Sequence, residues 1–135
     1  MAGKTPEKLF VCIFRVKAYY YKNVDRLNAK GIPLPPKLKA IRERRVQFTG
    51  ELMEKGVLWM GGPAVDAPLS MNIFAVDSIE EAIKLQRNDP CFAEGLFYND
   101  KYFEWELHVA FTKVSARLRE RHKKLMASRK RITHR

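Results

Sequence analysis

The side chains best suited to acid–base chemistry in this sequence are its three histidines, His108, His122 and His134. An imidazole exchanges a proton near neutral pH. None of the three has another histidine or a cysteine at the spacing of a metal site. His122 and His134 lie in a basic segment and are expected to be solvated. His108 shares an expected strand face with Glu104 and Glu106, so it is either a general acid or base or a hydrogen-bonded structural residue.

A glycine-rich turn signal lies in the middle of the chain, at Gly61-Gly62-Pro63. It lacks the lysine and the spacing of a phosphate-binding loop, and no other cofactor motif is evident. We expect it to bend a strand or to bring backbone close to a pocket, which makes Gly62 and Pro63 candidate substrate-binding residues. Trp59 and Trp105 could wall an apolar ligand site, and the alternative for both is the core or a dimer interface. The sequence thus predicts a site without cofactor or metal.

The hydrophobic pattern predicts one α+β domain that would position these residues. In the segment 37–55, apolar residues recur at helical spacing and charged residues fill the positions between them. A capping box at Ser78 and Glu81 begins a second helix. The expected order is β-α-β-β-α-β with an antiparallel sheet, the ferredoxin-like arrangement. Helices would cover one sheet face, and pairing with a second copy is one way to cover the other. The expected strands are 8–16, 57–60, 69–76 and 97–113, and the expected helices are 37–55 and about 78–88.

The segment 17–36 is expected to be a loop insertion, because it contains Gly31 and the cluster Pro33-Leu34-Pro35-Pro36. The first strand, 8–16, is apolar at almost every position, which predicts that both of its faces are covered.

Charge and composition set the class of protein. The chain has 135 residues, 46% of them hydrophobic, and a net charge of +11. The segment 113–135 carries ten Lys or Arg and one acid, which gives +9 and leaves +2 for the rest. We therefore expect a domain at 1–113 and a basic C-terminal helix or tail at 114–135. We expect this helix to be partly docked and solvated. Its charge also suggests an anionic partner, with nucleic acid as the weaker alternative because no aromatic residues alternate with the basic ones.

The remaining composition favours a cytoplasmic protein. No apolar run is long enough for a membrane span or a signal peptide. Cys12 and Cys91 are too few and too far apart for a disulfide framework or a zinc ribbon, so both are expected to be buried as small hydrophobic residues.

Four segments in order resemble the YCII-like family. They are LFVCIF at 9–14, LMEKG-VLWMGGP at 52–63, SIEEA at 78–82 and NDPCFAEGL at 88–96. The resemblance covers about residues 9–111. It implies a ferredoxin-like domain, similar in fold to muconolactone isomerases, whose protomers pair sheet to sheet into a dimeric α/β barrel. It also implies a pocket with a His–Asp pair and, for some members, a role in aromatic-compound or natural-product pathways.

The resemblance assigns the aspartate to Asp89 and places Arg45 where the histidine is expected, or Arg44 if the alignment slips by one. An arginine cannot act as a base near neutral pH. We expect Arg45 to bind a substrate anion and to depress the pKa of Asp89, with His108 as a rival catalytic group. The alternative is a plain ion pair that holds a helix to a loop.

Two functions follow as expectations. The first is a cofactor-independent isomerase or lyase that moves a proton on a small organic acid or lactone. The second is a non-catalytic small-molecule-binding or accessory protein whose basic tail docks an anionic partner.

Overall fold

A computed structural model of the chain describes residues 8–107, 120 and 123–124. His108 and nearly all of the basic tail lie outside these residues, so the boundary at 113 and the tail helix stay predictions. The described elements are β1 (Leu9–Val16), α1 (Ala18–Lys30), α2 (Pro36–Glu54), β2 (Leu58–Pro63), β3 (Leu69–Ala75), α3 (Ile79–Arg87), α4 (Pro90–Ala93) and β4 (Phe97–Trp105).

The four strands form one antiparallel sheet in the order β2-β3-β1-β4. Strand β1 lies between β3 and β4, with Cys12 opposite both Asn72 and Tyr102. The two outer strands are therefore β2 and β4, and the predicted α+β, ferredoxin-like class is confirmed.

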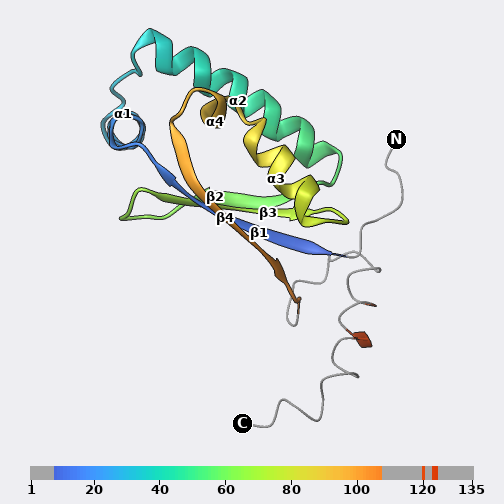
Figure 1. Cartoon of the computed structure of the whole chain (residues 1–135). Coiled ribbons are helices and arrows are strands. Elements are labelled where there is room, and N and C mark those ends of the chain that lie inside the picture. The colour runs from blue at the N-terminus through green and yellow to red at the C-terminus, as the bar shows by residue number, and fades with distance from the viewer. Residues whose placement is uncertain (1–7, 108–119, 121–122, 125–135) are drawn as a thin grey trace.

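All four described helices lie on one face of the sheet (Figure 1). Because strand side chains alternate between faces, Phe10, Cys12 and Phe14 of β1 point toward these helices. They form the larger core with Leu38 and Ile41 of α2. This packing fixes α2 over the sheet, which is what positions Arg45.

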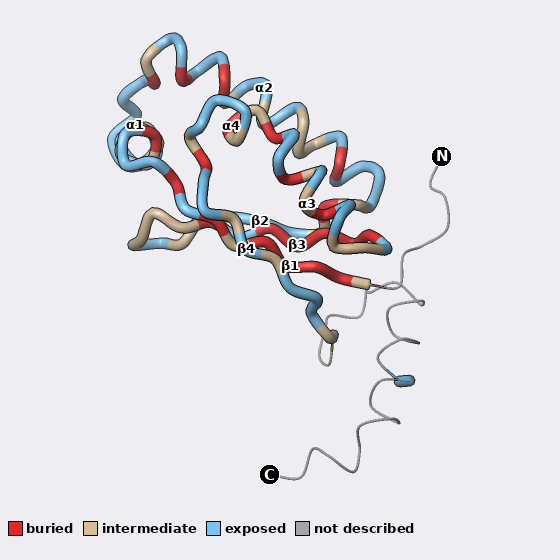
Figure 2. Tube along the Cα trace, in the orientation of Figure 1, coloured by how far each residue is buried: buried red, intermediate tan, exposed pale blue. Residues whose placement is uncertain are grey.

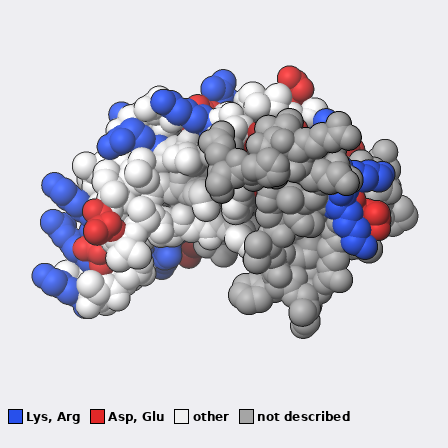
Figure 3. All heavy atoms as spheres, turned by 90° about the horizontal axis from the view of Figure 1, so that it is seen from below, with Lys and Arg blue, Asp and Glu red and all other residues white. Residues whose placement is uncertain are grey.

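The opposite face of the sheet carries a smaller apolar cluster. Leu9 and Val11 of β1 are buried there beside Ile73 and Ala75 of β3. Strand β1 is thus buried on both sides, as its sequence predicted (Figure 2). Figure 3 looks onto this side of the molecule, where the coloured charged side chains lie around the edges and white, uncharged atoms lie between them.

The predicted loop at 17–36 is wrong over most of its length, since residues 18–30 form helix α1. Tyr20, Val24 and Leu27 recur at helical spacing and pack on the core. Gly31 ends the helix in the left-handed conformation, with φ of 67°. The prolines do not break α1, because they follow it, and Pro36 occupies a position in the first turn of α2 where its missing N–H costs nothing.

Other elements also differ from the expectation. The last strand, expected at 97–113, ends at Trp105, and the described residues 106–107 lie outside it. Strand β2 continues through Gly61, Gly62 and Pro63 instead of turning there, and its register slips between Leu58 and Met60. The short helix α4 after Asp89 was not predicted.

The capping box is confirmed, because the Ser78 side chain accepts a hydrogen bond from the backbone N–H of Glu81. In the described part of the chain, no helix combines the length and apolar character needed to cross a membrane.

Candidate functional site

Asp89 begins helix α4 and is one of the most deeply buried side chains, at 1% exposure. Its Oδ1 accepts a hydrogen bond of 2.8 Å from the backbone N–H of Cys91. Aspartate before proline is a favoured helix start. Its carboxylate caps backbone N–H groups of the first turn, and Pro90 itself has no N–H that needs a partner. The capping role therefore accounts for one carboxylate oxygen.

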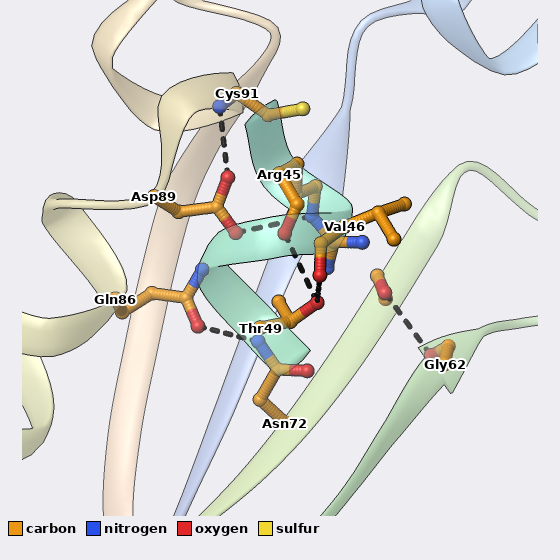
Figure 4. A network of polar contacts seen from close by, with 9 residues as sticks. Arg45, Val46, Thr49, Gly62, Asn72, Gln86, Asp89 and Cys91 are labelled. Atoms are coloured by element: carbon orange, nitrogen blue, oxygen red, sulfur yellow. Dashed lines mark hydrogen bonds and ion pairs between the residues drawn. The ribbon is translucent and has the colours of Figure 1, made fainter. Parts of the chain in front are cut away.

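The other oxygen of Asp89 binds Arg45, which projects from the middle of α2. The distance from Arg45 Nε to Asp89 Oδ2 is 3.0 Å. The Arg45 side chain is 24% exposed, and its guanidinium lies 5.0 Å from the centre of the Phe97 ring. The ion pair joins α2 to the start of α4 (Figure 4), and the contact with the Phe97 ring joins α2 to β4. A cation over an aromatic ring adds to the ion pair.

Arg44 points the other way. Its side chain is 57% exposed and pairs with Glu94 at 3.6 Å. Arg45, and not its neighbour, is thus the inward residue that contacts Asp89.

Burial raises the pKa of the Asp89 carboxyl, while the Arg45 charge and the bonds from Cys91 and Arg45 lower it. Burial is the larger effect, so the pKa lies above its usual range. The predicted depression of this pKa is therefore wrong. The arginine acts in the expected direction but does not outweigh the cost of removing the carboxylate from water.

Tyr20 and Cys91 also belong to this cluster, and sequence reasoning missed the tyrosine. The Tyr20 hydroxyl and the Cys91 thiol each act on the pKa of the other, and both side chains are buried. Burial raises the pKa of Cys91 to about 11, and the nearby Asp89 charge adds to this rise. Recognition of α1 would have found Tyr20, because it is the one fully buried residue of that helix.

A second buried polar pair lies beside the ion pair. Asn72 donates to Gln86 Oε1 at 2.7 Å, and among the described residues Gln86 Nε2 has no hydrogen-bond partner (Figure 4). Gly61 lies opposite Asn72 in the neighbouring strand β2, and a Cβ there would lie 2.1 Å from Asn72 Oδ1. The absence of a side chain at Gly61 thus leaves room for the Asn72 side chain that bonds Gln86.

The structure does not bring every predicted site residue to Asp89. Trp59 packs on the opposite sheet face, with Leu9 and Val11. Gly62 and Pro63 lie in the outer strand β2, where the Gly62 carbonyl accepts a bond of 3.0 Å from Ser70. His108 lies outside the described residues. Within residues 8–107, 120 and 123–124, no three His, Cys, Asp or Glu side chains cluster as metal ligands.

Comparisons with known proteins place the chain in a family. The YCII-related domain matches residues 14–106. A solved structure, "5-chloro-2-hydroxyhydroquinone dehydrochlorinase from Burkholderia phenoliruptrix AC1100: complex with 2,5-dihydroxybenzoquinone", is similar at 21% identity and a TM-score of 0.47, covering 72% of this chain and 92% of that one. No curated protein matches. Since the domain match spans well over half of the sequence, the chain belongs to the YCII-related family.

Proposed function

We propose that this protein is a cofactor-independent enzyme that moves a proton on a small organic acid or lactone, in aromatic-compound or natural-product metabolism. The reaction would be an isomerisation, an elimination or a cyclisation. Asp89 would be the base and Arg45 the anion-binding residue. The observation that carries this proposal is a buried carboxylate of raised pKa, held 3.0 Å from a partly exposed arginine.

This arrangement suits a base that becomes active when substrate binds. The guanidinium has five N–H donors, and the contact with Asp89 uses the one on Nε. A substrate carboxylate or enolate oxygen that binds the other donors would draw positive charge away from Asp89. The pKa of Asp89 would then rise further, because the effect that opposes burial is weakened. A carboxyl with a pKa closer to neutral is a better proton acceptor.

The proposed step balances simply. Asp89 takes a proton from carbon next to a carbonyl, and the C–H electrons move into an enolate whose oxygen is stabilised by Arg45. The proton returns to a different carbon in an isomerisation. In an elimination, the enolate electrons expel a leaving group instead. Neither route needs an oxidant or a bound cofactor.

The test is deuterium uptake from D₂O at carbon, followed by NMR on a panel of unsaturated lactones and β-keto acids. The variant Asp89→Asn keeps an oxygen that can cap α4 but removes the base, so exchange should fall at least a hundredfold. The matched control is Glu94→Gln, which removes an exposed carboxylate at the other end of α4. Exchange that is catalysed equally well by Asp89→Asn would remove Asp89 from the mechanism.

A second function is favoured by one observation: both carboxylate oxygens of Asp89 are already engaged. In that case the pair is structural, and the protein is a non-catalytic binding or accessory protein whose basic tail docks an anionic partner. Deletion of residues 114–135 tests this. If the deletion abolishes retention on heparin while intact protein catalyses no exchange, the accessory role holds. Duplex DNA binding that weakens steeply with salt would identify nucleic acid as the partner.

We also propose that the protein is a homodimer that pairs through the helix-free side of the described sheet. Met60, Met71, Phe103 and Trp105 are large apolar side chains exposed on or beside this face, which supports the proposal. Phe103→Glu should yield a monomer by light scattering. Val65→Glu is the control, since Val65 is 97% exposed in the β2–β3 connection. A dimer that survives Phe103→Glu would place the interface elsewhere.

A further inference from the structure

A cleft separates the two helices that follow β1. It lies between α1 and the first half of α2 and has a volume of about 360 Å³. This is at the small end of the range for ligand pockets, enough for one ring or a short branched chain. We call it the α1–α2 cleft. Helix α1 contributes Leu27 to its lining, and this helix was expected to be a loop.

The α1–α2 cleft has an apolar lining on both sides, which we call the apolar wall. Leu27 of α1, Pro33 and Leu34 line it from one side, and Val46 of α2 lines it from the other. Leu34 is buried and belongs to the main core, which gives this wall a fixed position. Val46, in contrast, is 59% exposed. An apolar ligand body that covers Val46 would gain the free energy of removing that surface from water.

The rim of the cleft is charged and comes entirely from α2. It consists of Lys39, Arg42 and Glu43, which sum to one positive charge. Lys39 and Arg42 are three residues apart and therefore neighbours on one helix face. Lys39 is exposed, whereas Arg42 is half-buried. A half-buried cation at the edge of an apolar wall attracts an anion more strongly than a fully solvated one, because water screens it less.

Arg42 also connects the cleft to the buried cluster. Burial raises the pKa of Tyr20 and of Cys91, and the charge of Arg42 acts against this rise at both groups. The guanidinium is therefore close enough to act on the side chains that pack beside Asp89.

We propose that the α1–α2 cleft binds a small organic anion with an apolar body, such as an aromatic carboxylate. Its carboxylate meets Arg42 and Lys39, and its ring covers Val46 and Leu27. This site is distinct from the Arg45–Asp89 pair, and binding there does not depend on whether Asp89 is a base. A compact inorganic anion would satisfy the rim but leave the apolar wall exposed to water, so the structure favours the larger ligand.

The first experiment is a titration of the full-length ¹⁵N-labelled protein with three probes, followed by amide chemical shifts. Benzoate combines ring and charge, benzamide has the ring alone, and acetate has the charge alone. Benzoate should shift the amides of Leu27 and Val46 in a saturable way, at least tenfold more tightly than either other probe. Equal affinity for benzoate and benzamide would overturn the role of the charged rim. Equal affinity for benzoate and acetate would overturn the role of the apolar wall.

Two rim variants should then change benzoate affinity in opposite directions. Arg42→Gln removes a charge-assisted hydrogen bond and should weaken binding about tenfold. Glu43→Gln removes the one negative charge of the described rim, which repels benzoate, and should tighten benzoate binding. Lys37→Gln is the matched control, an exposed cation on α2 that does not line the cleft, and should change nothing.

Lys39→Gln provides a second loss-of-charge variant if Arg42→Gln alters the fold, since Lys39 is exposed. The proposal is overturned if benzoate shifts no amide of the cleft. It is also overturned if Lys37→Gln weakens binding as much as the rim variants do, because the attraction would then come from general positive charge.

Discussion

Replacement of Arg45 by methionine tests the central contact directly. Arg45→Met keeps an unbranched apolar stem that can still pack against Phe97, but it removes the guanidinium that binds Asp89. Asp89 is then left at 1% exposure without its cation. The carboxyl must stay charged in an apolar environment, keep its proton, or force a local rearrangement.

The expected loss of stability follows from burial. Removal of one partner from a buried ion pair costs about 3–5 kcal/mol. Here the arginine side is 24% exposed, so water can reach part of the space it leaves, and about 2–3 kcal/mol is expected at pH 7. A small domain has a total unfolding free energy of roughly 5–15 kcal/mol, so this is a large fraction. With a urea slope of about 1–1.5 kcal/mol per molar, the unfolding midpoint should fall by roughly 2 M.

The loss should depend on pH. The pKa of Asp89 in the folded protein already lies above its ordinary value of 3.8, and removal of Arg45 raises it further. Between 3.8 and the folded pKa, the unfolded chain releases a proton that the folded chain keeps. Stability therefore falls as pH rises through this window. The cost of Arg45→Met should be smallest near pH 4 and largest at pH 7.

A double-mutant cycle with Asp89→Asn isolates the pair. Urea unfolding should be followed at pH 4, 5.5 and 7 for both single variants and the double variant. In the double variant no buried charge is left alone, so it should be more stable at pH 7 than Arg45→Met by about 1 kcal/mol or more. A loss below about 0.5 kcal/mol for Arg45→Met, or an equal loss at pH 4 and pH 7, would refute the reasoning. Arg45→Lys, which keeps the charge, should lose less than the methionine variant.

Three further predictions concern other parts of the fold. Gly61→Ala places a Cβ 2.1 Å from the buried Asn72 amide and should destabilise by about 2 kcal/mol in urea unfolding, while Gly62→Ala, where the structure has open space, should stay within about 0.5 kcal/mol; equal effects would refute it. Burial raises the pKa of Asp100, but hydrogen bonds from an arginine and from Tyr102 outweigh burial and lower the pKa overall. The contribution of Asp100 to stability is therefore present above pH 3.8 and is lost as pH falls through the folded pKa. Tyr102→Phe should therefore cost about 1 kcal/mol at pH 7 and less at pH 2.5, and a loss independent of pH would contradict this. Both cysteine thiols are fully buried with raised pKa values, so they should react with a thiol reagent only at the rate of unfolding; fast reaction of the native protein would show that one is accessible.

The sequence predicted the parts of the fold where one signal dominates. Continuous apolar residues in β1 indicated burial on both faces, and the capping box fixed the start of α3. The family resemblance also pointed to the site contact, because it assigned the aspartate to Asp89 and the position of the histidine to Arg45. Helical periodicity then places Arg45 on the same side as Leu38, Ile41 and Leu52, which are buried.

The errors arose where two local signals compete. Proline and glycine after α1 indicated a loop, yet they are the end of one helix and the start of the next. The register of β2 also shifts between Leu58 and Met60, where Trp59 is an extra residue relative to β3. Leu58 packs in the main core, so ordinary alternation already places Trp59 on the sheet face away from Asp89, and the register shift changes the face of Met60 instead. Such a shift depends on the partner strand and has no signature in the local sequence.

The arginine at the position where the family resemblance places a histidine changes what the pair can do. A His–Asp pair changes its charge near neutral pH, because the imidazole gains or loses a proton there. Arg45 stays charged over that whole range, so any proton that moves must be carried by Asp89. In the proposed mechanism, Asp89 would reach a substrate only if Arg45 shares or leaves their contact, since the carboxylate is buried and bonded at both oxygens. Catalysis and binding therefore make opposite demands on one distance: an enzyme requires the 3.0 Å contact to weaken when an anion binds, whereas a binding protein requires it to persist.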